Sequence, residues 1–495
     1  MRQYKINLLS SWSVIVINIA IVFFLTPVII ETFGTFKYGI WILINSVVSY
    51  ISLMEAGVNI STGRFVNIAY SRDNTQEASE YLSSSLAFYT LLPLVVVPVS
   101  MLLLVVFFPE SKDFELIRLE ILTAAFFAVS ALLLNLISSN IRIKLNTNQR
   151  FELVALIEML SLLLNAALTL IYMKLFSGES LAVMSLIVFV TAVLGLLLSL
   201  FFSHIYGVSL QLRFKYASSK TFKKIINFSI WVLLSNLAVV SINHSDNFII
   251  SGLINVEAVS TYAVGFMISF YLVNMLSKIN QVKNPEIQQL VGRADVSGLT
   301  ILLQRLITNN LIFSIPVIIC FYLFIDSFIL LWLGEQFSES AVVAKILAAP
   351  SICILLSQGA GAALWAKGLA KTLSLVKIVG AMLNIVLSVV LISVFELSLV
   401  GVAIATSLVS FLECLVLIPF LYLKQMKPQK GSVLLLPIAG VVTCFSIIYL
   451  TTNLVKLEIS DWIILVLTGG SVCSLFIGFS YLLCSKLKFN IEHEN

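Results

Sequence analysis

The sequence LLPLVVVPVSMLLLVVFF, residues 91–108, decides the fold. It carries no charged side chain over its whole length. A helix of about 20 apolar residues crosses the hydrocarbon core of a bilayer. A strand of a membrane barrel alternates apolar with polar residues, and this stretch does not alternate. It therefore predicts a transmembrane helix.

The whole chain repeats this pattern. Of its 495 residues, 59% are hydrophobic and 11% are charged, whereas soluble proteins have about 25% charged residues. The first apolar run lacks a small-residue cleavage site, so we expect a retained helix and not a signal peptide. The gaps between runs leave no room for a soluble catalytic domain. We predict an all-α polytopic membrane protein with 14 transmembrane helices, centred near Ile19, Val47, Val96, Phe126, Leu163, Val190, Ala238, Ile268, Ile315, Leu355, Val386, Leu408, Cys444 and Leu467.

The basic residues predict the orientation. If the gaps between helices are numbered alternately from the N-terminus, 24 of the 30 lysines and arginines fall in one class and 6 in the other. Cytoplasmic loops retain lysine and arginine. We therefore expect both termini in the cytoplasm.

The two halves of the chain resemble each other at an offset near 220 residues. SSWSVIVINIAIV (10–22) resembles FSIWVLLSNLAVV (228–240), which aligns Asn18 with Asn236. A repeat of six helices enters the membrane twice from the same side, so the copies are related by a pseudo-two-fold axis along the membrane normal. We expect an N-lobe over 1–220 (helices 1 to 6), a C-lobe over 221–430 (helices 7 to 12), and helices 13 and 14 with a cytoplasmic tail over 431–495.

Asparagines recur on one face of the predicted first and seventh helices. Asn18 lies on the first, and Asn236, Asn243 and Asn247 follow helical spacing on the seventh. Polar side chains at membrane depth face a protein interior or a water-filled cavity. They either line a substrate pathway between the lobes or form hydrogen bonds between helices.

Charged residues inside the apolar runs are candidates for ion coupling or gating. At an offset of 219, Glu158 aligns with Lys377, which indicates either structural ion pairing, within or between the lobes, or a pair that breaks as the lobes move. Asp246 lies near the outer interface beside His244, where either a structural role or proton or sodium coupling fits. Glu55 and Glu413 are comparable candidates.

Further basic residues end helices on the predicted cytoplasmic side: Arg64, Lys278, Lys283 and Lys367. Each is either a topology determinant or a contact for a diphosphate. No nucleotide-binding loop and no cluster of metal ligands occurs in the sequence, so we expect no catalytic residues, no cofactor and no metal.

Four stretches carry a family resemblance: PVIIETFGTFKYGIW (27–41), MEAG (54–57), DNFIISGLINVEAVSTYAVG (246–265) and LVGVAIATSL (399–408). Their order and spacing resemble the polysaccharide transporter branch of the multidrug/oligosaccharidyl-lipid/polysaccharide (MOP) exporter superfamily. The family's usual aspartate before the glycine of the second stretch is Glu55 here.

The resemblance implies a flippase of the bacterial cytoplasmic (inner) membrane. Such a protein moves an undecaprenyl-diphosphate-linked oligosaccharide to the outer leaflet by alternating access, for O-antigen (lipopolysaccharide), capsule or a related surface polysaccharide. The implied partners are this lipid-linked oligosaccharide, membrane lipids and a glycan polymerase, with no nucleic acid. A cation-coupled exporter of drugs or metabolites from the same superfamily is the alternative, and a membrane enzyme such as a glycan polymerase is disfavoured because the outer gaps are short.

Overall fold

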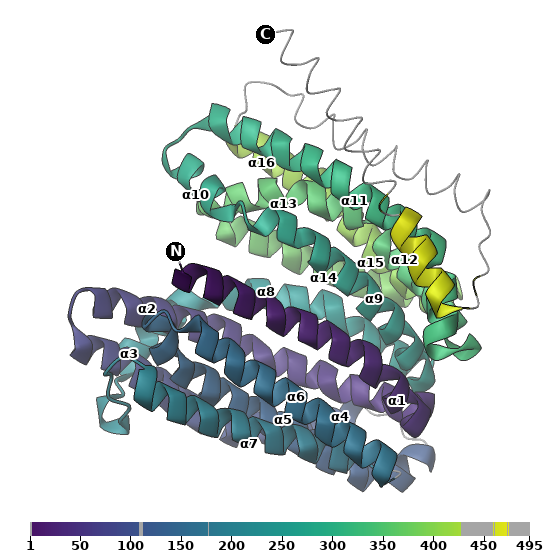
Figure 1. Cartoon of the computed structure of the whole chain (residues 1–495), viewed down its shortest axis with the longest axis horizontal. Helices are drawn as coiled ribbons and strands as arrows, with labels where there is room; N and C mark the ends of the chain where they lie inside the picture. Colours follow the sequence, from purple (N-terminus) through teal and green to yellow (C-terminus); the bar gives the residue numbers. More distant parts are fainter. Residues whose placement is uncertain are drawn as a thin grey trace. The chain divides into compact units, whose positions relative to one another are not determined.

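The computed structural model describes residues 2–107, 112–176, 178–426, 459, 461–472 and 474. Within these ranges the regular structure is entirely helical (Figure 1). The chain divides into two compact units, Met1–Ser260 and Thr261–Asn495. The elements up to residue 253 are α1 (Arg2–Met54), η1 (Glu55–Asn59), α2 (Ile60–Ser71), α3 (Thr75–Leu91), α4 (Pro93–Phe107), α5 (Lys112–Thr147), α6 (Phe151–Leu175), α7 (Leu181–Tyr206), η2 (Phe214–Tyr216) and α8 (Ser219–Leu253).

The elements that follow begin with α9 (Val256–Gln281), whose first turn lies in the first unit. They continue with α10 (Asn284–Gly292), α11 (Val296–Leu333), η3 (Glu335–Phe337), α12 (Ser338–Ala348), α13 (Ser351–Ala366), α14 (Ala370–Ser393), α15 (Ser398–Phe411), η4 (Leu412–Leu417) and α16 (Ile418–Met426). A shorter apolar helix spans Trp462–Val472.

The expectation of an all-helical polytopic membrane protein is confirmed. Ten stretches of the described chain are long and apolar enough to cross a membrane: Ser13–Ser71, Thr75–Leu102, Ile117–Thr147, Phe151–Leu175, Leu181–Tyr206, Val256–Lys278, Val296–Leu333, Glu335–Ala366, Ala370–Ser393 and Ser398–Met426. The first of these holds both of the first two predicted spans, which meet at Gly34, where φ is 69°. The predicted seventh span coincides with α8, which is not among these ten stretches.

The predicted count of 14 is not reached by these ten. The thirteenth predicted helix, centred on Cys444, lies outside the described residues, and of the fourteenth the structure describes a helix over Trp462–Val472. The total of 14 therefore stays a prediction.

Small residues let helices of the first unit approach closely. Along the contact between α5 and α7, the hydroxyls of Ser138 and Ser199 lie 2.7 Å apart and both side chains are buried. Ser199 also donates to the carbonyl of Gly195 within α7. Membrane helices have no hydrophobic driving force for association in lipid, so close packing of small residues and interhelical hydrogen bonds hold them together.

A glycine also explains part of the stretch KYGIW. A Cβ atom on Gly39 would lie 2.2 Å from the carbonyl oxygen of Val256. Only a residue without a side chain allows α1 to approach the start of α9 so closely. Gly39 therefore fixes this contact within the first unit.

The second unit holds a chain of buried amides. Asn280 of α9 donates to Gln358 of α13 (2.8 Å) and to the carbonyl of Leu355 (3.0 Å), and Asn310 of α11 donates to Asn280 (2.8 Å). Gln358 in turn donates to Ser277 (2.6 Å). These bonds join three helices and pair amide donors that would be costly to bury alone. The Oδ1 of Asn310 has no hydrogen-bond partner among the described residues. The lobe boundary that the repeat predicts after residue 220 stays a prediction.

Candidate functional site

The end of α8 carries a buried polar cluster of the first unit. Asp246 is fully buried, at 0% exposure, and Asn247 beside it donates from Nδ2 to the hydroxyl of Ser46 on α1 at 2.9 Å. Tyr50, one helical turn further along α1, is hydrogen-bonded to Ser241 and interacts electrostatically with Asp246. We call Ser46, Tyr50, Ser241, Asp246 and Asn247 the α1–α8 cluster. It joins the second segment of α1 to α8.

His244 is adjacent in sequence but is only half-buried. Its Nδ1 is buried and has no hydrogen-bond partner among the described residues. A neutral imidazole with one unoccupied nitrogen can accept a proton or a hydrogen bond. This histidine and Asp246 together give the end of α8 two titratable groups.

The four asparagines predicted to share one face of the first and seventh helices differ in their surroundings. Asn247 forms a hydrogen bond between helices, which was the alternative to a pathway role. Asn18, Asn236 and Asn243 are half-buried. A pathway role for these asparagines stays a prediction.

Glu158 and Lys377 each form an ion pair inside their own unit. In the first unit Arg142 of α5 lies 2.8 Å from Glu158 of α6; in the second, Lys377 of α14 lies 2.6 Å from Glu413 of η4. Exposure is distributed unevenly within each pair. Glu413 is 6% exposed and Lys377 34%, whereas Arg142 is 14% exposed and Glu158 45%. The buried partner is thus the carboxylate in one unit and the cation in the other.

Glu55 and Glu413, the two comparable candidates for ion coupling, both lie in π-helical turns. Glu55 begins η1 and Glu413 lies in η4. Such turns are rare and frequently mark functional sites. The side chain of Glu55 is outside what the structure describes, while that of Glu413 is buried.

The predicted cytoplasmic cations mostly pair locally. Lys278 donates to Gln281 at 3.1 Å, and Lys283 lies 2.9 Å from Glu286. Lys367, just after α13, donates to the backbone carbonyl of Gln425 in α16. Arg64 is exposed on α2. These contacts fit helix ends at a water interface, and a role in binding diphosphate stays a prediction.

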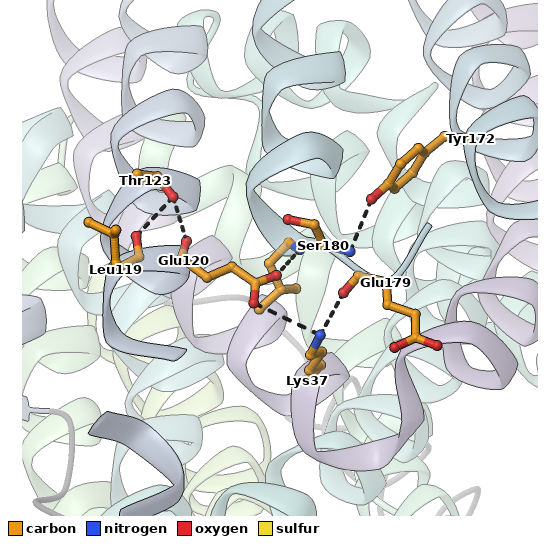
Figure 2. Close-up of polar contacts among 8 residues, drawn as sticks. Lys37, Leu119, Glu120, Thr123, Tyr172, Glu179 and Ser180 are labelled. Carbon is orange, nitrogen blue, oxygen red and sulfur yellow. Dashed lines mark hydrogen bonds and ion pairs between the residues drawn. The ribbon is translucent and has the colours of Figure 1, made fainter. Parts of the chain in front are cut away.

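Sequence reasoning missed a polar network around the start of α7 (Figure 2). Lys37 donates to the backbone carbonyl of Glu179 at 2.7 Å and lies 3.9 Å from the Glu120 carboxylate. Glu120 also accepts from the backbone N–H of Leu181 at 2.6 Å, and Tyr172 accepts from the N–H of Ser180 at 3.0 Å.

This network, which we call the Lys37–Glu120 network, caps the first turn of α7 and ties α1, α5 and α6 to it. A carboxylate on the unpaired N–H groups at a helix N-terminus is stabilising. The one available sequence signal was that Lys37 and Glu120 are charges beside long apolar runs.

The second unit also contains a cavity of about 260 Å³ among α9, α11, α13, η4 and α16. Its wall is mostly leucine, isoleucine and other apolar residues, with the amides of Asn280 and Asn310 at one part. Cys353 and Cys414 line it and are free thiols. Both are buried and pack as small core residues.

Comparison with known proteins agrees with this architecture. The polysaccharide biosynthesis protein family matches residues 76–342. The uncharacterized membrane protein EpsK of Bacillus subtilis (strain 168) is 21% identical over 98% of this chain and 96% of its own length.

Solved structures show the same fold. An inward-facing multidrug resistance MATE family transporter of the MOP superfamily superposes with a TM-score of 0.68, at 13% identity over 87% of this chain and 95% of the other. The lipid II flippase MurJ in its inward closed conformation gives a TM-score of 0.63, at 16% identity over 91% of this chain and 99% of the other. The chain therefore belongs to the polysaccharide biosynthesis protein family and is a multi-pass membrane protein with the fold of the MOP-superfamily transporters.

Proposed function

We propose that this protein is a flippase for an undecaprenyl-diphosphate-linked oligosaccharide, and that it acts in the bacterial cytoplasmic membrane with both termini in the cytoplasm. The barrier to flipping is the polar head, because the isoprenoid tail is already soluble in the bilayer. The protein then needs only a polar path for sugar and diphosphate. Alternating access of two six-helix lobes provides that path.

The strongest support for the proposal is the combination of family and fold. The family is one of polysaccharide biosynthesis, and the chain has the fold of a lipid II flippase along 91% of its length. A polysaccharide that is assembled on a lipid carrier inside the cell requires a membrane step of this kind. O-antigen and capsule are the candidate products, and a glycan polymerase is the partner expected to use the flipped unit.

The α1–α8 cluster is proposed to couple transport to an ion. Asp246 lies fully buried on α8, beside His244. A buried carboxylate that exchanges a proton or a sodium ion changes the local charge, and that change can bias two conformations. Glu413, held by Lys377 in the second unit, and Glu55 in η1 are the further candidates for coupling or gating.

A genetic and chemical experiment tests the function. Deletion of the gene should abolish surface glycan and cause lipid-linked repeat units to accumulate on the cytoplasmic face, where externally added glycan-modifying enzymes cannot reach them. Accumulation on the outer face would instead place the defect in polymerisation, and the proposal would fail.

The pathway is tested separately by cysteine accessibility. Single cysteines at Asn18, Asn236 and Asn243, in a background without the native cysteines, should react with a water-soluble thiol reagent. Cysteines at two exposed apolar positions should instead be protected by lipid: Val16, on the opposite face of α1 from Asn18, and Leu237, about 100° around α8 from Asn236. Uniform protection of the asparagine positions would remove the pathway.

A cation-coupled exporter of small molecules is the second candidate, because the MATE transporter superposes with the higher of the two TM-scores. Unchanged surface glycan together with altered drug tolerance in the deletion strain would favour it.

A further inference from the structure

The segment that connects α7 to α8 is an ordered part of the first unit. Residues 207–218 leave α7 and run across α3. Val208 and Leu210 are buried and pack in the same core as Val66, whereas Gln211 and Arg213 are exposed. This alternation with a period of two is the pattern of extended backbone with one buried face. The segment therefore presents a defined outer face.

Three serines of α3 hold the segment in place. Ser79 accepts from the N–H of Gln211 (3.1 Å), and Ser83 both donates to the Gln211 carbonyl (3.2 Å) and accepts from the N–H of Arg213 (3.3 Å). Ser84 accepts from the N–H of Ser218 (3.0 Å). These bonds satisfy backbone groups that an extended segment otherwise leaves unpaired.

The outer face of this segment and the first turn of α8 are strongly basic. Five cations occur within twelve residues, and no aspartate or glutamate occurs between Glu179 and Asp246. All five are exposed, and none of them forms an ion pair within the part of the chain that the structure describes. We call this set the basic collar: Arg213, Lys215, Lys220, Lys223 and Lys224.

Aromatic side chains are interleaved with the collar. Phe214, between the first two cations, is 64% exposed, and Lys215 lies 5.1 Å from the centre of the Tyr216 ring. An exposed phenylalanine next to lysines costs free energy in water, but it is favourable at the headgroup level of a bilayer. The collar follows α7, one of the ten candidate spans, and begins α8, which coincides with the predicted seventh span. This position places it at the headgroup level.

We propose that the basic collar binds anionic phospholipid headgroups of the leaflet on its own side, which the charge distribution predicts to be the cytoplasmic leaflet. Lys and Arg donate to phosphate oxygens, Phe214 inserts among the glycerol groups, and the serines of α3 keep the cations in position. Clusters of four to eight basic residues next to a membrane helix recognise anionic lipid in this way. The proposal goes beyond the flipping function and does not depend on it.

Binding of lipids to the purified protein tests the proposal. We expect phosphatidylglycerol, titrated into the delipidated protein and counted by native mass spectrometry, to bind more tightly than phosphatidylcholine. Each basic residue near an anionic surface contributes about fivefold to binding. The triple variant R213Q/K215Q/K220Q should therefore bind phosphatidylglycerol roughly 100-fold more weakly. The control R72Q/R293Q/K424Q removes the same charge from other exposed positions of the predicted cytoplasmic side and should keep the wild-type affinity within about fivefold.

Three results would overturn the proposal. One is unchanged phosphatidylglycerol affinity in the folded triple variant; another is an equal loss in the control, which would reduce the effect to net charge. The third is loss of inorganic pyrophosphate binding in the triple variant with unchanged lipid binding, which would make the collar a diphosphate site. If the triple variant does not fold, the single variants R213Q and K215Q replace it: each should weaken phosphatidylglycerol binding about fivefold, whereas R72Q should leave it unchanged. Equal losses in all three would overturn the proposal.

Discussion

The ion pair between Lys377 and Glu413 gives the sharpest prediction for stability. Glu413 is 6% exposed and Lys377 34%. Replacing Lys377 with methionine leaves a buried carboxylate without its cation, and breaking a buried pair in this way costs about 3–5 kcal/mol. Replacing Glu413 with glutamine leaves a partly exposed lysine, whose long stem can carry the charge to another polar group. Its loss is comparable to that of a surface pair, about 1 kcal/mol or less.

The two variants should therefore differ by about 2–4 kcal/mol, which is a factor of roughly 30 to 1,000 in the folding equilibrium. The double variant K377M/E413Q removes both charges and should recover most of the loss seen in K377M. The charge-swapped variant K377E/E413K should retain both stability and flipping if the pair is structural, and should lose flipping alone if the pair must break during transport. Reversible unfolding of the purified protein by SDS in mixed micelles at pH 7 measures the free energies.

The pair between Arg142 and Glu158 supplies a matched control, because its exposures are reversed: Arg142 is 14% exposed and Glu158 45%. There the carboxylate variant E158Q should be the more damaging, since it strands a buried guanidinium, and R142M the milder. The reasoning is refuted if K377M costs no more than E413Q, or if the order of the two costs is the same in both pairs.

Four further perturbations test the contacts described above. E120A should lower the unfolding free energy by about 2 kcal/mol by removing the cap of α7 and the partner of Lys37, whereas E120Q keeps an acceptor for the helix and should cost less than half as much in the same SDS assay. G39A should cost about 1–3 kcal/mol, because its new methyl group overlaps a backbone carbonyl, and a melting temperature equal to wild type would contradict the close packing. N247L should cost only about 0.6 kcal/mol, so a loss of flipping at normal protein level would reveal a pathway role beyond the hydrogen bond. The N–H of Gly298 and the hydroxyl of Ser297 hold the pKa of Asp295 below its usual range. The stability that this gives is present above the ordinary aspartate pKa and is lost as pH falls through the lowered pKa. Melting curves of wild type and D295N should therefore converge in acid.

Sequence patterns located the membrane helices well because apolar length is a local property. The run at 91–108 predicts a helix from its own residues alone. In the structure its described residues are helical, apart from a single turn residue, Leu92, before Pro93. The same patterns also indicate buried polar groups on α8. Asp246 and Asn247, singled out for their place in an apolar run, are both buried beside α1.

The partners of charged residues were harder to predict, because pairing depends on which helices are neighbours. The repeat aligned Glu158 with Lys377, and equivalent positions share a depth in the membrane. Each side chain nevertheless pairs with an opposite charge on another helix of its own unit, Arg142 in one case and Glu413 in the other. The charge count places Lys37 among the six basic residues of the minority class, in the predicted outer gaps. Its closest acceptor is a backbone carbonyl, and a carbonyl carries no signal in the sequence.

The π-helical turns have a geometric consequence for the helices that continue from them. An α-helix advances 100° per residue, and a π-turn accommodates one residue more than an α-turn. If η1 changed to α-helix, its extra residue would be added to the helix that follows. The helix α2 would then rotate by about 100° about its axis. Such a screw motion would turn Arg64 to a different neighbour without bending the backbone or separating any lobe. The same holds for η4 and α16, so each unit carries its own built-in register change next to an acidic residue.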